Sequence, residues 1–533
     1  MCFKGERRKG VLIMDDVYRL AKPRKKGLLH LVFSRFFLVL VLVVLQIILA
    51  IVFYGWLENL LPFFSFVLVL ITLGGVIYLF NSGMDSSAKL TWMFVIAILP
   101  VSGVAFLIFT RVNLGHRKIQ DRVGELISMT KDAVSQPEGV MEKLAATRSG
   151  TDDLVTYLNN SGCFPAFDQT EVTYFPLGED KFAALLAELK KAESFIFMEY
   201  FIIDEGYMWG EILKILEQKA KAGVEVRVMY DGMLEVSTLP TNYRKLLEER
   251  GIRAKAFSPI KPFISSHYNY RDHRKILVID GKVAFNGGVN LADEYINRRE
   301  RFGHWKDTAV MLKGDAVKSF TLMFLQMWNI DEPKPVFDPW LKEGGDLPEH
   351  PSGYVIPYGD CPLDNDKVGE TVYMDILNRA EDYVHIMTPY LILDGELETA
   401  LKYAAQRGVD VKIILPGIPD KEMPYALAKM HYKRLIEAGV KIYEYTPGFV
   451  HAKVFTSDDR KAVVGTINLD YRSLYHHYEC ATYMFETACI PEIEKDFQDT
   501  LAKCSEVTEQ TIKDEKFFYK LAGSLLQFIA PLM

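Results

Sequence analysis

The chain has 533 residues, of which 49% are hydrophobic and 25% charged, and its formal net charge is −7. This length suffices for more than one structural unit with a buried core. Residues 1–35 are basic, with a net charge of +7, which leaves −14 for the rest of the chain. An acidic catalytic region argues against a nuclease, which offers a basic track to a phosphate backbone, so we expect no nucleic-acid partner.

Three apolar runs follow the basic leader 1–35, at residues 36–54, 60–80 and 90–110, and no charged side chain interrupts any of them. Each run is close to the ~20 residues with which a helix crosses a bilayer. The leader lacks the small-residue cleavage site of a signal peptide. We therefore predict a multi-pass membrane protein whose transmembrane helices lie in residues 36–110.

The topology of this region is ambiguous, because basic residues flank it on both sides and each basic flank favours the cytoplasm. Three crossings cannot leave both flanks on one side. Either one run is re-entrant or interfacial, or one flank breaks the rule. We favour a cytoplasmic leader and a cytoplasmic catalytic region.

Residues 111–150 are polar and helix-prone, with Pro137 as an interruption, and we predict a linker helix there. An internal repeat then divides the chain into halves at residues 151–335 and 336–505. Both halves read as strand, helix, strand, helix, strand, with the strands in residues 194–204, 222–232 and 250–257 and in residues 382–394, 407–417 and 438–445. This order predicts an α/β fold of two related halves with largely parallel sheets and flanking helices.

The end of the chain and the cysteines give weaker signals. The tail, residues 506–533, ends in a short apolar stretch that contains Lys520, and we expect a helix lying on the membrane surface. The six cysteines form no C-x-x-C pair and have no histidine at zinc-finger spacing. We predict free thiols and no disulfide framework.

A repeated motif carries the chemistry. HRKILVIDGKVAFNGGVN, residues 273–290, returns as HAKVFTSDDRKAVVGTIN, residues 451–468. Each copy places a Lys two residues after a His, an Asp five residues after that Lys, and an Asn at the end. These are His273, Lys275, Asp280 and Asn290 in the first copy, and His451, Lys453, Asp458 and Asn468 in the second.

A strand explains the spacing of His and Lys, because residues two apart point to the same face and can aim at one ligand. Two such strands would present imidazoles, ammonium groups and Asn amides to a phosphate that gains charge in a transition state. Asp280 and Asp458 lie too far along their strands to meet that ligand, and we interpret them as structural supports. No carboxylate cluster indicates a metal site, so we expect neither a metal nor another cofactor.

The two complete H-x-K-x4-D motifs resemble those of the phospholipase D superfamily. Within it the chain is most similar to the bacterial cardiolipin synthases, through GGVNLADEYIN at 287–297, GHWKDTAVMLKGDAV at 303–317 and GTINLDYRSL at 465–474. The likeness covers nearly everything after about residue 60. That family usually has two membrane spans, so the first apolar run is an addition.

The resemblance implies a phosphatidyltransferase of the bacterial cell membrane that acts on phosphatidylglycerol without a cofactor. His273 would attack the phosphorus of one phosphatidylglycerol while His451 protonates the leaving glycerol. His451 would then accept a proton from the hydroxyl of a second phosphatidylglycerol, which attacks to give cardiolipin. The reverse assignment of the two histidines stays open, and so does oligomer formation.

The resemblance also assigns the surrounding residues. Lys275, Lys453, Asn290 and Asn468 would bind the nonbridging phosphate oxygens, with Thr466 beside them where the first copy has Gly288. Glu294 and Glu479 match acidic positions that the family places behind the catalytic imidazoles. His477 stands where the family more often has Asn.

Two alternatives remain from the sequence. The first is a hydrolase of the same superfamily, acting on a phospholipid or a nucleic acid, because water and a glycerol hydroxyl compete for the same intermediate. The second is a non-enzymatic membrane scaffold that has kept the fold. Degenerate copies usually lose a motif His or Lys, and both pairs are intact here.

Overall fold

The computed structural model describes residues 17–20, 48, 52, 55, 63–111, 114–259, 270–342, 348–364, 366–515, 517–528 and 530. The predicted basic leader 1–35 lies outside these residues except for 17–20. The first apolar run, residues 36–54, lies outside them except for 48 and 52.

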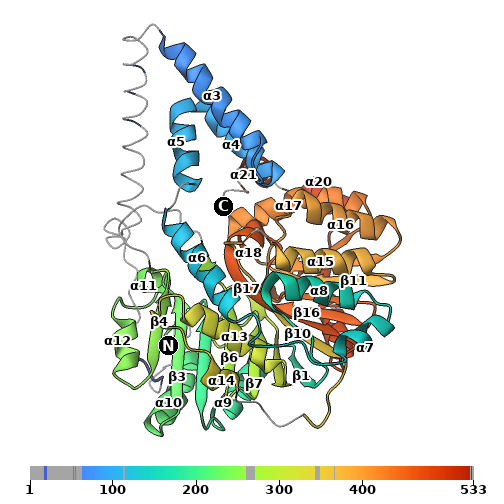
Figure 1. Ribbon diagram of the computed structural model, residues 1–533. Helices are drawn as coiled ribbons and strands as arrows, with labels where there is room; N and C mark the ends of the chain where they lie inside the picture. The colour runs from blue at the N-terminus through green and yellow to red at the C-terminus, as the bar shows by residue number, and fades with distance from the viewer. Residues whose placement is uncertain are drawn as a thin grey trace, which may run out of the picture.

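The second and third apolar runs form three helices, α3 (Phe64–Phe80), α4 (Ser86–Ile98) and α5 (Pro100–Arg111), which stand at the top of Figure 1. The prediction of one helix over residues 90–110 is wrong. The chain leaves the helical conformation at Leu99, because Pro100 has no N–H to donate and disfavours a helical residue before it. Within the described part of the chain, no helix combines the length and the apolar character needed to cross a membrane.

Three helices lead from this region into the first half: α6 (Leu114–Met129), α7 (Val140–Ala146) and α8 (Thr151–Gly162). Pro137 lies between α6 and α7, where the sequence places an interruption. The Arg122 guanidinium on α6 donates a hydrogen bond to the carbonyl oxygen of Glu332 at 2.6 Å. This contact fixes α6 to the end of the first half.

The first half is a seven-stranded sheet with the order β1-β9-β7-β6-β2-β3-β4. Its strands are β1 (Thr170–Phe175), β2 (Phe195–Tyr200), β3 (Glu225–Asp231), β4 (Arg253–Phe257), β6 (Lys275–Ile279), β7 (Val283–Gly287) and β9 (Ala309–Gly314). Its helices are α9 (Gly178–Leu189), α10 (Tyr207–Lys221), α11 (Leu234–Ser237), α12 (Tyr243–Glu248), the 3-10 turn η2 (Asp293–Ile296), α13 (Val317–Trp328) and α14 (Asp338–Leu341).

The second half repeats this plan, with the order β10-β17-β16-β15-β11-β12-β13-β18. Its strands are β10 (Tyr354–Asp360), β11 (Tyr383–Met387), β12 (Asp410–Pro416), β13 (Lys441–Tyr445), β15 (Val454–Ser457), β16 (Lys461–Gly465), β17 (His477–Phe485) and β18 (Cys504–Glu506). Its helices are α15 (Val368–Arg379), α16 (Gly395–Gln406), α17 (Glu422–Glu437), α18 (Tyr471–Tyr475), α19 (Ile490–Leu501), α20 (Glu509–Asp514) and α21 (Phe517–Gln527).

The sheets are mixed, so the prediction of largely parallel sheets is wrong. Only the strand–helix–strand part of each half is parallel, β2-β3-β4 and β11-β12-β13. Each motif instead forms an antiparallel hairpin, β6-β7 or β15-β16. The chain reverses at Asp280 and Gly281, with φ of 53° and 64°, and at Asp458 and Asp459, with φ of 55° and 53°. Such left-handed residues allow a short loop to join neighbouring antiparallel strands.

The halves are joined by two short strand pairs that lie next to the motif histidines. β5 (Arg271–Asp272) runs parallel to the start of β17, and β14 (Gly448–Val450) runs parallel to β8 (His304–Lys306). The N–H of His273 then donates to the carbonyl of Tyr478 at 2.9 Å, and that of His451 to the carbonyl of Lys306 at 2.7 Å. Each histidine therefore enters its site while bound to the opposite half.

The C-terminal helix α21 packs on α17, where the Tyr519 hydroxyl donates to Glu422 at 2.5 Å. After the helix, the ring of Phe528 meets that of Phe94 on α4, with centroids 4.3 Å apart. Leu521 and Leu525 remain exposed on α21. The tail thus connects the second half to the apolar N-terminal helices, and its position on a membrane surface stays a prediction.

Candidate active site

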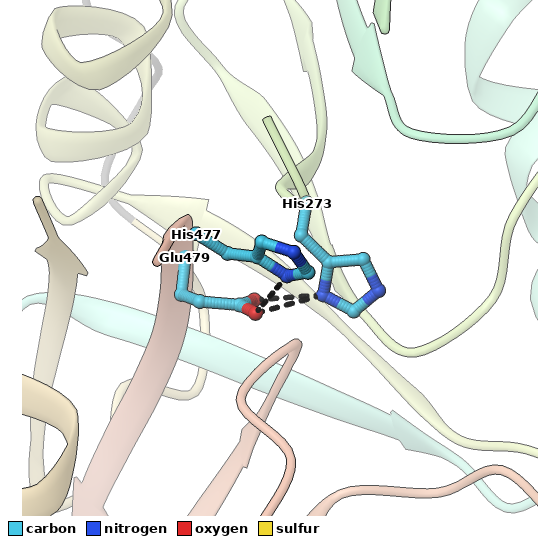
Figure 2. Close-up of side chains that lie close together, drawn as sticks. All are labelled: His273, His477 and Glu479. Atoms are coloured by element: carbon cyan, nitrogen blue, oxygen red, sulfur yellow. Dashed lines mark hydrogen bonds and ion pairs between the residues drawn. The ribbon is translucent and has the colours of Figure 1, made fainter. Parts of the chain in front are cut away.

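The two motif histidines are each held by a carboxylate from the opposite half. Nδ1 of His273 lies 2.9 and 3.0 Å from the two carboxylate oxygens of Glu479 (Figure 2). Nδ1 of His451 lies 2.7 Å from Oδ2 of Asp307. A carboxylate that accepts the Nδ1 proton fixes the ring and leaves the Nε2 lone pair for a ligand.

Burial keeps both imidazoles neutral. Only 6% of His273 and 8% of His451 is exposed. Burial lowers the pKa of His273 well below its ordinary value, although Glu479 opposes the shift. Burial, together with Lys453, lowers the pKa of His451 to about 4, against the opposing effect of Asp307. Both rings therefore carry a free lone pair at neutral pH, as a nucleophile or a general base requires.

The motif lysines lie beside their histidines, Lys275 at the start of β6 and Lys453 directly before β15. Nζ of Lys275 donates to the carbonyl oxygen of His273 at 2.6 Å, and Nζ of Lys453 donates to the carbonyl oxygen of His451. Burial lowers the pKa of Lys275 to about 8 and that of Lys453 to about 7. A phosphate that arrives between them would favour the charged ammonium forms, because an anion nearby stabilises a cation.

The two motif asparagines differ in their contacts. The Asn290 amide donates to the Tyr295 hydroxyl at 2.8 Å and accepts from the N–H of Ile202 at 3.0 Å, so it connects η2 to the segment that follows β2. Oδ1 of Asn468 is buried and has no hydrogen-bond partner among the described residues. Asn468 is therefore the asparagine whose polar atoms are less engaged by the protein.

Thr466 and Gly288 occupy equivalent positions in the two motifs, and they affect the positions of the Glu479 and Asp307 carboxylates in different ways. The Thr466 hydroxyl donates to Oε2 of Glu479 and accepts from the N–H of Cys480 at 3.0 Å. A Cβ at Gly288 would lie 2.1 Å from Oδ1 of Asp307, so only glycine leaves room for that carboxylate. Thr466 therefore orients Glu479, rather than lying free for a substrate as expected.

Asp280 and Asp458 lie outside this cluster, although they belong to the same motifs. The Asp280 carboxylate accepts hydrogen bonds of 2.8 Å from the N–H groups of Glu193, Ser194 and Phe195. Asp458 does the same for residues 381–383 at 2.9 to 3.0 Å. Each Asp thus fastens the hairpin loop of its motif to the start of the neighbouring strand, which agrees with a structural role.

Comparison with known proteins agrees with this arrangement. The family description "Cardiolipin synthase, PLD-like domain" matches residues 185–328 and 373–501, which include both motifs. The chain belongs to the PLD-like cardiolipin synthase family. An uncharacterized protein of Streptococcus mutans is 59% identical over 458 residues, covering 85% of this chain and 98% of that protein.

Relatives within the cardiolipin synthase family carry that name at lower identity. The cardiolipin synthase of Alkalihalophilus pseudofirmus is 34% identical over 357 residues, covering 67% of this chain and 71% of the relative. Cardiolipin synthase 2 of Bacillus anthracis is 35% identical over 367 residues, covering 68% and 71%. The chain is thus a PLD-superfamily phosphatidyltransferase of the cardiolipin synthase type.

A solved structure shares the two-half fold. It is the phosphatidylserine synthase of Haemophilus influenzae, with a TM-score of 0.55 and 15% identity, over 72% of this chain and 97% of that one. At this identity the likeness concerns the fold alone.

Glu294 does not support an imidazole, contrary to the expectation from this family. Its carboxylate binds the guanidinium groups of Arg299 and Arg301 instead. Asp307 takes the expected place behind His451, and sequence reasoning missed it. Glu479 follows Asn468 by 11 residues whereas Asp307 follows Asn290 by 17, so six extra residues hide the equivalence of the two carboxylates.

Aromatic rings and one further histidine complete the walls. Phe201 meets the ring of His273 edge-on, with centroids 4.9 Å apart, and Tyr295 meets His451 at 5.3 Å. His477 lies beside His273, with ring centroids 5.4 Å apart, and its Nδ1 lies 3.6 Å from Oε1 of Glu479 (Figure 2). The apolar ring faces limit water around both imidazoles, which strengthens electrostatic interactions in the site.

Proposed function

We propose that this protein is a cardiolipin synthase that transfers a phosphatidyl group from one phosphatidylglycerol to another. The observation that carries the proposal is the pair of neutral, buried imidazoles, each with Nδ1 on a carboxylate from the opposite half. The names of the relatives at 34 and 35% identity support the same substrates. In this reaction the protein needs no cofactor, because lysine ammonium groups supply the positive charge for the phosphate.

In the first step, Nε2 of His273 attacks the phosphorus of a phosphatidylglycerol. The bond from phosphorus to the glycerol oxygen breaks, and His451, which has taken up a proton from solvent on Nε2 as the substrate binds, donates that proton to the glycerol oxygen. The phosphodiester anion brings negative charge next to His451, which raises its pKa toward the range of a general acid. The product of this step is a phosphatidyl-histidine and free glycerol.

In the second step, the terminal hydroxyl of another phosphatidylglycerol gives its proton to Nε2 of His451. The oxygen attacks the phosphorus, the bond to His273 breaks, and cardiolipin leaves. Each proton transfer contributes on the order of 10²- to 10⁴-fold to the rate. Lys275, Lys453 and Asn468 stabilise the charge on the nonbridging oxygens.

The test is a product analysis with purified protein in detergent and phosphatidylglycerol as the sole lipid. The wild type is expected to form cardiolipin and glycerol in equal amounts, and His273→Ala and His451→Ala are expected to form neither. His350→Ala, at an exposed position, is the matched control. Phosphatidic acid as the lipid product, without cardiolipin, would contradict the proposal and favour the hydrolase.

The same proposal includes a bacterial cell-membrane location with the leader and both halves in the cytoplasm. Leader residues dock on the first half, where the Tyr18 hydroxyl donates to Glu217 at 2.6 Å and the Leu20 N–H donates to Glu205 at 3.0 Å. A leader bound to the catalytic half shares its side of the bilayer, so the number of crossings is even. Three crossings would separate the two.

Thiol labelling tests this topology in intact cells. A variant that keeps Cys2 alone and a second variant whose sole cysteine is Glu142→Cys, at an exposed site of α7, are treated with a membrane-impermeant maleimide. We expect both to be protected until the cells are opened. Labelling of only one of the two variants in intact cells would contradict the proposal that the leader and the catalytic halves lie on the same side of the membrane.

A further inference from the structure

His477 is a buried imidazole that the proposed reaction does not use. It is 7% exposed, and neither Nδ1 nor Nε2 has a hydrogen-bond partner among the described residues. The 3.6 Å from its Nδ1 to Oε1 of Glu479 is too long for a hydrogen bond. Buried polar atoms are rarely left unpaired, so two such nitrogens beside the catalytic pair indicate a missing ligand.

Three potential donor atoms converge at this point (Figure 2). They come from His273, His477 and Glu479, and these ligand atoms all lie within 4.8 Å of one another. His273 Nδ1 and His477 Nδ1 lie 2.9 and 3.6 Å from Oε1 of Glu479. Bonds of about 2.0–2.2 Å at tetrahedral angles separate zinc ligands by about 3.3–3.6 Å. The two distances to Glu479 lie within a few tenths of an ångström of this range, and a rotation of the imidazoles that brings their nitrogens to the same separation would seat an ion.

We propose that His273, His477 and Glu479 form a Zn²⁺ site whose occupation switches the transferase off. Two imidazoles and one carboxylate are a ligand set that zinc accepts in proteins, with a fourth position left for water or a phosphate oxygen. The inhibition rests on the proposed function, because it acts on the nucleophile of that reaction. The binding of the metal does not depend on the proposed function.

The inhibition follows from the tautomer of His273. In the active form, Nδ1 carries the proton, Glu479 accepts it, and Nε2 keeps the lone pair that attacks phosphorus. A metal ion takes the Nδ1 lone pair, so the ring proton must reside on Nε2. The ring stays neutral, but Nε2 then has no lone pair to offer. Chelation of the metal returns the proton to Nδ1 and restores the nucleophile.

The surroundings restrict which ion can bind. The ammonium group of Lys275 lies next to the site, donating to the carbonyl oxygen of His273, and opposes any cation. Only strong bonds to nitrogen overcome that repulsion, and Zn²⁺ forms such bonds with imidazole. Mg²⁺ prefers six oxygen ligands in an octahedron and gains little from two imidazoles. We therefore expect inhibition by Zn²⁺ and not by Mg²⁺.

The experiment first measures binding without substrate. The full chain, purified in detergent and with any histidine tag removed, is titrated with buffered Zn²⁺ by calorimetry, and Co²⁺ serves as a visible reporter of four-coordinate binding. We compare the wild type with His477→Asn, which lacks the imidazole. The matched control is His476→Asn, because His476 is the next residue and contacts Tyr270, with ring centroids 6.0 Å apart.

The wild type and His476→Asn are expected to bind one Zn²⁺ with equal affinity, whereas His477→Asn should bind it at least 10- to 100-fold more weakly. Removing an outer-shell partner of a metal ligand already lowers affinity by roughly this factor, and His477 would be a ligand itself. The concentration of Zn²⁺ that halves cardiolipin formation, measured relative to the metal-free rate of each variant, should rise by the same factor as the dissociation constant for Zn²⁺. Equal affinity of His477→Asn and wild type would overturn the site. Tight binding that leaves cardiolipin formation unchanged would overturn the switch.

Binding and function fail separately in this design. If the protein makes no cardiolipin, the proposed function falls, but the calorimetric difference between His477→Asn and His476→Asn still decides the metal site. If the wild type makes cardiolipin and binds no Zn²⁺, the metal site alone falls.

Discussion

Gly288 controls how closely Asp307 can approach the second imidazole. A Cβ at this position would lie 2.1 Å from Oδ1 of Asp307, and a Cβ does not come within 3.0 Å of another heavy atom. In Gly288→Ala the carboxylate must therefore retreat by about 1 Å. The 2.7 Å contact with Nδ1 of His451 then lengthens beyond hydrogen-bond distance.

The loss of the hydrogen bond between Asp307 and His451 can be converted into an expected change in rate. A hydrogen bond to a charged group contributes about 1.5–3 kcal/mol, and each 1.36 kcal/mol corresponds to a factor of about ten in rate. We expect Gly288→Ala to lower kcat/KM for cardiolipin formation by about 10- to 150-fold, with an unchanged unfolding temperature. Gly124→Ala is the control, because nothing lies within 4 Å of its added Cβ.

A double-mutant cycle decides whether the effect passes through Asp307. Asp307→Asn removes the charge that holds His451. Adding Gly288→Ala to that variant should therefore lower kcat/KM by less than about threefold. The assay is steady-state formation of cardiolipin and glycerol in detergent, with thermal unfolding as the check on folding. A full wild-type rate for Gly288→Ala, or an equal loss in both backgrounds, would refute the reasoning.

Substitutions at three further residues test the supports of the site and the electrostatics of the core. Thr466→Val removes the hydroxyl that orients Glu479 and should lower kcat/KM about tenfold, while Thr466→Ser keeps it; equal rates for the two variants would contradict the role. Asp280→Ala loses three backbone hydrogen bonds and should lower the free energy of unfolding by roughly 3 kcal/mol in denaturant titrations, with kcat per folded molecule retained; an unchanged midpoint would argue against the structural role. Burial, with a further contribution from Asp394, raises the pKa of Glu370 to about 8. Between pH values of about 4.5 and 8 the folded state therefore holds a proton that the unfolded state releases, so the free energy of unfolding falls as pH rises through this range. Glu370→Gln removes that dependence, so its unfolding temperature relative to wild type should rise between pH 5 and 8; a constant difference would refute the shift.

The repeated motif allowed much of the site to be predicted. The His and Lys of each copy lie together, although of these four residues only Lys275 lies in a strand. Asp280 and Asp458 lie apart from them, in the turns of the two hairpins rather than along the strands. The six strands of the two parallel parts were also located, at β2 to β4 and β11 to β13. These features are local, so the order of side chains along the chain is enough to reveal them.

The errors concern contacts between segments that are distant in sequence. Asp307 reaches His451 across 144 residues, and no local pattern distinguishes it from Glu294. The antiparallel hairpin of each motif was hidden, because strand direction depends on pairing that the strand–helix–strand pattern does not specify. Pro100 divides an apolar run whose composition alone suggests one helix.

The exchange of strands beside the two histidines makes the halves interdependent. β5 brings His273 to Glu479, and β14 brings His451 to Asp307. A half expressed alone would hold a histidine without its carboxylate and a carboxylate without its histidine. The protein is in this sense a dimer contained in one polypeptide. Fragments separated between the halves would be inactive alone and active when mixed.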